Sequence, residues 1–251
     1  MNDASPILQT VDLTKHFGMV TAADGINLQI SQGEFVGIVG ANGSGKTTFI
    51  NLTTGYLKPE KGDIMFMGKN TIGMPPRAII KSGLARSFQI PQLYTNMTVL
   101  ESLLLSLAAE SGNGGSFWHS LFGQSRVSEG MEMLERFGLR MYANRFVSEL
   151  PEGGRKLLDI MMSFALKPKL LLMDEPTSGV SIEDKFEVMD ILVKVLQESD
   201  ITTIFVEHDM EVIQRYAQRV LVFNDGRIIA DGEPESVLAD PEVRRNVLGK
   251  V

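Results

Sequence analysis

Short alternations of apolar and polar residues occupy the N-terminal region of the chain. Residues 7–13 and 26–30 alternate with a period of two, and the Asp24-Gly25 turn lies between them. This period places apolar side chains on one face of a strand, as in an antiparallel sheet with one buried face. Another apolar segment, residues 64–68, adds a further strand. The pattern therefore predicts an antiparallel β portion.

From about Pro75 the hydrophobic period lengthens to that of a helix, and residues 99–109 and 127–137 both show it. Apolar strand segments then alternate with helical segments, at residues 170–173, 182–197, 202–206, 210–217 and 220–223. Such alternation is typical of a parallel sheet covered by helices. We therefore predict an α/β protein in which a helical insertion interrupts a parallel, doubly wound core.

Composition limits the kind of protein. The chain has 251 residues with 43% hydrophobic content, which fits one large domain or two small ones with a full core. No apolar run approaches the roughly 18 residues of a membrane span, and the segment around Asp3 does not resemble a signal peptide, so we expect a soluble chain. The absence of cysteine excludes disulfides and thiolate metal sites, and it fits a cytosolic location. The net charge of −7 argues against broad nucleic-acid binding, because no basic surface would offset repulsion from phosphates.

A glycine-rich segment follows the apolar strand at residues 35–39 and precedes the helical residues 47–52. Its sequence is Gly40-Ala41-Asn42-Gly43-Ser44-Gly45-Lys46-Thr47, and Thr48 comes next. Glycines let consecutive backbone N–H groups turn toward a triphosphate, Lys46 reaches the β- and γ-phosphates, and the Thr47 hydroxyl is placed to ligate Mg²⁺. The alternative is a glycine-rich turn before an ordinary helix. We interpret residues 40–48 as a P-loop that binds ATP and Mg²⁺.

An apolar strand at residues 170–173 leads into two carboxylates, Asp174 and Glu175. In a P-loop protein the first, Asp174, supports Mg²⁺ and its water shell. The second, Glu175, can polarise an attacking water as general base. The alternative is a strand followed by an acidic helix cap.

A second strand, residues 203–206, ends in Glu207-His208-Asp209. A neutral histidine at the carboxyl end of a strand is well placed to contact a γ-phosphate or the attacking water. The alternative is a helix-capping residue. We therefore predict that His208 acts with Glu175 in catalysis.

Together these motifs resemble the ATP-binding subunits of ABC transporters, over essentially the whole chain. Asp174-Glu175-Pro176-Thr177 matches the family's second nucleotide motif, and His208 matches its switch histidine. The resemblance implies that Gln89, in Arg86-Ser87-Phe88-Gln89, contacts Mg²⁺ and the membrane subunits; the alternative is a surface glutamine. It also implies that Phe17 stacks on adenine, where the alternative is a core aromatic of an edge strand.

The resemblance implies one ABC ATP-binding domain over residues 1–251. Its RecA-like core with the β portion would comprise residues from about 1–85 and 165–251, and a helical subdomain about 90–163. The predicted fold class is therefore α/β, with a P-loop ATPase core containing a parallel sheet, an antiparallel β portion and a helical insertion subdomain.

Shorter segments resemble one branch of the family, the importer subunits for branched-chain amino acids. They are residues 86–89, 96–99, 206–210, 226–232, 240–243 and the loop around Trp118. They imply an ATPase that energises import of branched-chain amino acids or related amides, without identifying the solute. Its implied partners are transmembrane permease subunits and, indirectly, a periplasmic solute-binding protein. Its implied place is peripheral, at the cytoplasmic face of the inner (plasma) membrane.

Other readings of the motifs remain open. One is the ATPase of a lipid or lipopolysaccharide exporter, which shares much of this architecture. Another is a soluble ABC protein of DNA repair or translation, although such proteins usually carry two cores, coiled-coil insertions or basic stretches. A third is a nucleotide-binding subunit with little turnover, against which Lys46, Glu175 and His208 argue.

One segment departs from the family pattern. ABC subunits normally carry an LSGGQ-type signature at a helix N-terminus, where the serine hydroxyl and backbone N–H groups bind the γ-phosphate held by the partner subunit. This chain has Leu150-Pro151-Glu152-Gly153-Gly154 there. Counted without gaps from Asp174, Pro151 replaces the serine and lacks both its hydroxyl and its N–H, whereas a shifted alignment that pairs the two glycines puts Glu152 at the serine position. Either way a carboxylate lies near the triphosphate, which should weaken closure by a few kcal/mol. A homodimer would then contain two impaired sites, whereas a heterodimer could keep one good site. The resemblance to branched-chain importers, which are built from two different ATP-binding chains, implies a heterodimer with a second ATP-binding subunit.

Overall fold

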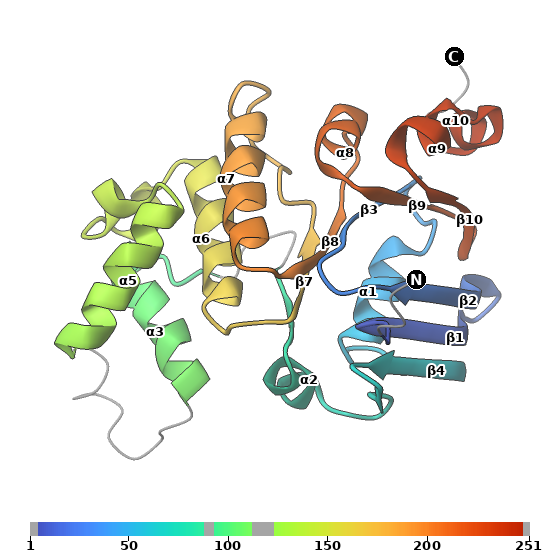
Figure 1. Ribbon diagram of the computed structural model, residues 1–251, viewed down its shortest axis with the longest axis horizontal. Helices are drawn as coiled ribbons and strands as arrows, with labels where there is room; N and C mark the ends of the chain where they lie inside the picture. The colour runs from blue at the N-terminus through green and yellow to red at the C-terminus, as the bar shows by residue number, and fades with distance from the viewer. Residues whose placement is uncertain (1–4, 88–92, 112–122, 248–251) are drawn as a thin grey trace.

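The computed structural model describes residues 5–87, 93–111 and 123–247. One of its two sheets is antiparallel and comes from the N-terminal region (Figure 1). Its strands, in spatial order, are β2 (Val20–Ile30), β1 (Leu8–Phe17), β4 (Lys61–Phe66) and β5 (Lys69–Asn70). The predicted antiparallel β portion is confirmed, with Leu8 opposite Ile30 on one side and opposite Phe66 on the other.

The second sheet has six strands and carries the functional loops. Its spatial order is β10 (Arg227–Gly232), β9 (Arg219–Asn224), β3 (Phe35–Gly40), β8 (Thr202–Val206), β7 (Leu170–Asp174) and β6 (Leu84–Arg86). All neighbouring pairs are parallel except β10 with β9. The parallel core is therefore confirmed, with one antiparallel edge strand. The helical interpretation of the residues after Pro75 is wrong for Leu84–Arg86, which form strand β6. A strand of three residues is too short to show the two-residue alternation of apolar and polar side chains.

Helices cover both faces of this sheet. They are α1 (Lys46–Thr53), α2 (Pro76–Ser82), α3 (Val99–Ser111), α5 (Gln124–Arg136), α6 (Glu152–Phe164), α7 (Asp184–Glu198), α8 (Met210–Tyr216), α9 (Pro234–Ala239) and α10 (Pro241–Val247), with short 3₁₀ turns η1 (Arg140–Tyr142) and η2 (Val147–Glu149). Helices α3 and α5 lie at one end of the molecule and the antiparallel sheet at the other (Figure 1). Within the described ranges, no helix has the length and apolar character needed to cross a bilayer.

The core has two parts, one on each face of the parallel sheet. Along β7, Leu171 and Met173 face the part that includes α3, α5, α6 and α7, whereas Leu170 and Leu172 face the part that includes α1 and the antiparallel sheet. Strands β3, β7 and β8 are buried along their whole length. Burial on both faces explains why apolar residues run consecutively in β3 and β7, and in β8 after Thr202 and Thr203, rather than alternating with polar ones.

Candidate active site

The predicted P-loop connects the buried strand β3 to helix α1, and its backbone requires glycine. Gly43 and Gly45 have φ of 80° and 106°, in the region that side chains other than glycine rarely adopt. At Gly45 a Cβ atom would also lie 2.4 Å from the backbone oxygen of Ala22, which leaves no room for a side chain. The loop can therefore curve tightly at the end of β3, and its last residues, from Lys46 on, form the first turn of α1.

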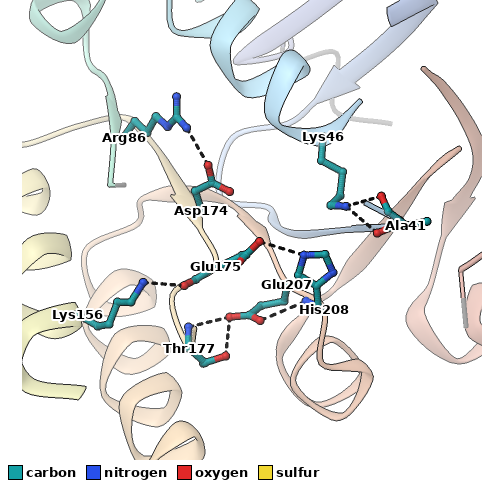
Figure 2. Close-up of polar contacts among 10 residues, drawn as sticks. Ala41, Lys46, Arg86, Lys156, Asp174, Glu175, Thr177, Glu207 and His208 are labelled. Atoms are coloured by element: carbon teal, nitrogen blue, oxygen red, sulfur yellow. Dashed lines mark hydrogen bonds and ion pairs between the residues drawn. The ribbon is translucent and has the colours of Figure 1, made fainter. Parts of the chain in front are cut away.

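Lys46 lies buried in this loop, where its Nζ atom donates hydrogen bonds to the carbonyl oxygens of Gly40 at 2.6 Å and Ala41 at 3.0 Å (Figure 2). Burial lowers the pKa of Lys46, and the negative charges of Glu175 and Asp174 oppose that change. The ammonium group is thus held among carbonyls and carboxylates, where a bound phosphate would supply further negative charge.

A small cavity of about 140 Å³ opens beside the loop. It is lined by residues 42–48 together with Glu175, Val206 and His208. The buried hydroxyl of Ser44 borders it and has no hydrogen-bond partner among the described residues. A polar group buried without a partner is costly, and a phosphate oxygen would satisfy it. The residues present therefore fit a nucleotide triphosphate tail.

Glu175 and His208 meet at this cavity from neighbouring strands. The Nε2 atom of His208 lies 3.0 Å from Oε1 of Glu175, and the two side chains point toward one another (Figure 2). Glu175 adopts a left-handed φ of 51°, and its backbone N–H donates to the carbonyl of Val206 at 3.0 Å. The Nζ atom of Lys156, on α6, donates to the carbonyl of Glu175 at 3.2 Å. These contacts hold a carboxylate at the cavity wall, where it can accept a proton from a water.

Asp174 is the most buried of the predicted site carboxylates. Its Oδ2 atom lies 2.8 Å from Nη2 of Arg86, and Nη1 of Arg86 donates to Oδ1 of Asn51 at 2.6 Å (Figure 2 shows the ion pair). The Arg86 and Asp174 side chains are only 10% and 5% exposed. A buried carboxylate is stable only when it is paired and hydrogen-bonded, and Arg86 supplies that pairing from the end of β6.

The altered segment, Leu150 to Gly154, lies at the start of α6. Pro151 precedes the first helical residue, Glu152, and no side chain caps the helix. The Glu152 carboxylate is 44% exposed and lies 3.5 Å from Nη1 of Arg155, so it is only partly neutralised by its neighbour. The helix N-terminus therefore carries a carboxylate, whereas an anion site there would need backbone N–H groups that are accessible to the anion.

Other predicted site residues lie as follows. Thr47 and Thr48 line the cavity, whereas Phe17 lies at the end of β1, 49% exposed, with Nζ of Lys15 5.5 Å from its ring centroid. Phe17 does not line the cavity. Gln89 lies outside the described residues, as does Trp118.

A magnesium ion suits the donors present. Within the part of the chain that the structure describes, no three His, Cys, Asp or Glu side chains form a cluster that could hold a metal alone. A P-loop magnesium site needs no such cluster, because one hydroxyl, one carboxylate, phosphate oxygens and water supply its ligands. Thr47 and Asp174 are residues of those types.

Sequence reasoning missed several residues that position the site, namely Arg86, Asn51, Lys156 and Thr177 as partners of site groups. A cation at the end of a short strand was a usable signal for Arg86, because the acidic end of a neighbouring parallel strand would lie beside it. Lys156 gave a weaker signal as a cation on the apolar face of a helix. The partner of Thr177 could not be inferred from local sequence.

A P-loop at the end of β3, with acidic residues at the ends of β7 and β8, defines a P-loop nucleotide-binding protein with a hydrolytic site. The sequence model of the family described as "ABC transporter" matches residues 23–178. The chain belongs to this family, as one of its ATP-binding subunits, and it is an ATPase.

Named relatives and solved structures agree with this assignment. The chain is 32% identical to the high-affinity branched-chain amino acid transport ATP-binding protein BraF of Pseudomonas aeruginosa, over 98% of each chain. It is 34% identical to a probable branched-chain amino acid transport ATP-binding protein, LivG, of Archaeoglobus fulgidus, over 97% of this chain and 95% of that protein. An ATP-binding cassette of an ABC transporter, MJ1267 in its ADP conformation, superposes with a TM-score of 0.84 at 32% identity, covering 98% of this chain and 100% of the other.

Proposed function

We propose that this chain is the ATP-hydrolysing subunit of an importer for branched-chain amino acids or related amides, paired with a different ATP-binding chain. The names of relatives that match nearly the whole chain support the solute class. They favour amino-acid transport over the lipid or lipopolysaccharide exporter. Transmembrane permease subunits would bind this chain at the cytoplasmic face of the inner membrane, and a periplasmic solute-binding protein would deliver the solute.

In this proposal the predicted site residues have separate roles in ATP hydrolysis. Residues 40–48 bind the phosphates and Phe17 stacks on the adenine. Thr47, Gln89 and Asp174 hold Mg²⁺, which when bound neutralises charge on the β- and γ-phosphates.

Glu175 takes a proton from the attacking water, whose oxygen forms a bond to the γ-phosphorus as the bond to the ADP oxygen breaks. His208 orients Glu175 and contacts the γ-phosphate. The 3.0 Å contact between His208 and Glu175 at the cavity wall supports this pairing of roles.

The observation that carries the unequal pairing is the start of α6. In this family a nucleotide site forms between two subunits, and a dimeric ATP-binding cassette, MJ0796, is 26% identical to this chain with a TM-score of 0.78. Pro151 offers no N–H, and the carboxylate of Glu152 at the first helical position repels a γ-phosphate. The P-loop of this chain is therefore suited to bind the phosphates, whereas the altered signature at the start of α6 is poorly suited to bind the γ-phosphate of a partner's ATP. A different chain with an intact signature would complete its site.

The composition of the native complex tests the pairing. An affinity tag on this chain, expressed at its native level, would be used to purify the complex from detergent-solubilised membranes for native mass spectrometry. We expect one copy of this chain, one different ATP-binding chain and the permease subunits. A complex with two copies of this chain and no other ATP-binding chain would overturn the proposed pairing.

Transport tests the solute class separately. Proteoliposomes that contain the purified complex and its solute-binding protein would be loaded with ATP and supplied with radiolabelled leucine, valine or a small amide. We expect ATP-dependent uptake of one of these solutes. Uptake of none of them, by a complex that hydrolyses ATP, would overturn the solute assignment and leave the ATPase assignment intact.

A further inference from the structure

A buried carboxylate lies directly behind the pair formed by Glu175 and His208. Glu207 is only 3% exposed, and its Oε1 atom accepts hydrogen bonds from the backbone N–H of Thr177 at 2.8 Å and from the Thr177 hydroxyl at 2.7 Å (Figure 2). Its Oε2 atom accepts from the backbone N–H of His208 at 3.3 Å. None of these contacts reaches the cavity that would hold the phosphates, so Glu207 acts on its neighbours rather than on a ligand there.

These hydrogen bonds join the loops that carry the two catalytic candidates. Thr177 lies two residues after Glu175, in the loop that follows β7, and Glu207 precedes His208 in the loop that follows β8. Strands β7 and β8 are parallel neighbours, with Asp174 opposite Val206. The carboxylate of Glu207 therefore ties the two loops together just beyond the point where the sheet stops holding them.

The loop that Thr177 begins also reaches the start of α6. The backbone N–H of Val180 donates to the carbonyl of Thr177 at 3.1 Å, which closes a turn around Gly179. A Cβ atom built on Gly179 would lie 3.5 Å from Cγ of Glu152, so this turn packs against the altered signature segment. Anchoring Thr177 thus fixes the turn relative to both the catalytic pair and the helix that would face a partner subunit.

Burying a carboxylate costs free energy unless hydrogen bonds compensate it. Burial raises the pKa of Glu207, and the hydrogen bonds from Thr177 and His208 oppose that rise. A buried acceptor with all its contacts made holds its donors in one arrangement, because any other arrangement leaves charge unpaired. A group that holds its hydrogen-bond donors in one arrangement can also fix the position of Glu175 relative to His208.

We propose that Glu207 is a positioning residue for ATP hydrolysis, which through Thr177 holds the loops of Glu175 and His208 in one arrangement and links them to the turn against α6. The inference rests on the roles proposed above for Glu175 and His208. A group of this kind changes the rate of the chemical step, since small displacements of a catalytic group slow the reaction strongly, and it leaves ATP binding nearly unchanged.

The test compares Glu207→Ala, Glu207→Gln, Thr177→Val and the double variant Glu207→Ala with Thr177→Val, each in the assembled complex. The matched control is Glu211→Gln, an exposed carboxylate near the start of the next helix, α8. The measurements are kcat, KM for ATP and thermal unfolding.

We expect kcat to fall about tenfold or more in Glu207→Ala and by a smaller factor of a few in Thr177→Val, which removes the hydroxyl bond to Glu207 and keeps the backbone N–H bond. KM for ATP should stay within about twofold of the parent in both variants. Glu207→Gln should recover most of the lost kcat, because its side-chain oxygen still accepts from Thr177. The double variant should be no slower than Glu207→Ala, because Glu207→Ala already removes both hydrogen bonds of the connection that Thr177→Val weakens. Glu211→Gln should behave like the parent.

A parent-like kcat in Glu207→Ala or in Thr177→Val would overturn the inference. So would additive losses in the double variant, or losses that appear only as a higher KM. If Glu207→Ala fails to fold, Thr177→Val and Glu207→Gln still decide the question, because both keep the side-chain volume. Glu175→Gln separates this inference from the proposed function: if it is inactive while Thr177→Val is fully active, only the positioning role fails.

Discussion

The Nε2 atom of His208 lies 3.0 Å from the Oε1 atom of Glu175, although the two residues are 33 positions apart in the sequence. The sheet brings them together, because each follows the carboxyl end of one of two neighbouring parallel strands, β8 and β7. The contact orients the carboxylate at the cavity that the P-loop lines. A site built this way would require no rearrangement to bring the proposed base and the histidine together.

Glu175→Gln tests the general base. An amide cannot take the proton from water, so kcat should fall by about 10² to 10⁴ while ATP binding is kept. Steady-state hydrolysis and equilibrium binding of a fluorescent ATP analogue would measure the two effects. Glu187→Gln, an exposed carboxylate on α7, is the control. A loss of only a few-fold in Glu175→Gln would remove Glu175 as the base.

Arg86→Gln tests the buried ion pair with Asp174. Removing one partner leaves a buried carboxylate without its counter-charge, which typically costs about 3–5 kcal/mol of unfolding free energy. Urea denaturation of the purified chain would measure the change. Arg77→Gln, an exposed arginine on α2, should change the unfolding free energy by less than about 0.5 kcal/mol. Equal effects of the two substitutions would contradict the stabilising role of the pair.

Phe17→Ala tests the adenine contact. Loss of a stacked ring should weaken ATP binding by about 1 kcal/mol or more, and Phe17→Tyr should keep the affinity because its ring can still stack. Titration calorimetry with MgATP would measure both, and Met19→Ala, in the same turn and fully exposed, is the control. Unchanged affinity in Phe17→Ala would leave Phe17 as a half-exposed aromatic at the end of β1 with no part in ATP binding.

Glu207→Gln tests the pH dependence of stability. Because burial raises the pKa of Glu207 above its ordinary value of 4.5, the folded chain binds this proton more tightly than the unfolded chain. The stabilisation from the group is then fully present below pH 4.5 and is lost as pH rises through the folded-state pKa. The charged and titratable groups around it are Glu175, His208, Lys156 and Lys185.

Since glutamine does not titrate, the unfolding free energy of Glu207→Gln should fall less steeply with pH in that window, by at most about 1.4 kcal/mol per pH unit. Denaturant melts at a series of pH values would show it. Identical slopes for the parent and Glu207→Gln would mean that the carboxylate titrates alike in both states. Glu211→Gln, whose side chain is 77% exposed, should leave the slope unchanged.

Contiguous motifs could be predicted from the sequence, whereas contacts between distant segments could not. The P-loop is one run of residues between a strand and a helix, so its composition alone indicated both its shape and its chemistry. The pair Arg86–Asp174 spans 88 positions and Thr177–Glu207 spans 30, and both depend on the strand order β8, β7, β6. Alternation of strands and helices predicts a parallel sheet without giving that order. The role of Gln89 stays a prediction.

The departure at the start of α6 could be read from sequence because the signature has a fixed distance from Asp174. The structure adds that Glu152 is the first helical residue and is exposed, so its carboxylate lies at the helix N-terminus. Replacing Pro151 by serine, Glu152 by glycine and Gly154 by glutamine together would restore the signature. We expect this triple variant to dimerise on ATP and to hydrolyse it without another ATP-binding chain.

The ATPase rate of the purified wild-type chain by itself tests the central claim most directly. The rate per P-loop would be measured for the chain alone, for the triple variant alone and for the complete complex under the same conditions. The account predicts that the wild-type chain alone stays monomeric with ATP and hydrolyses it at less than about a tenth of the rate of the complex, because closure onto its own signature is weakened. ATP-dependent dimerisation of the wild-type chain alone, with a rate that matches the complex, would contradict it.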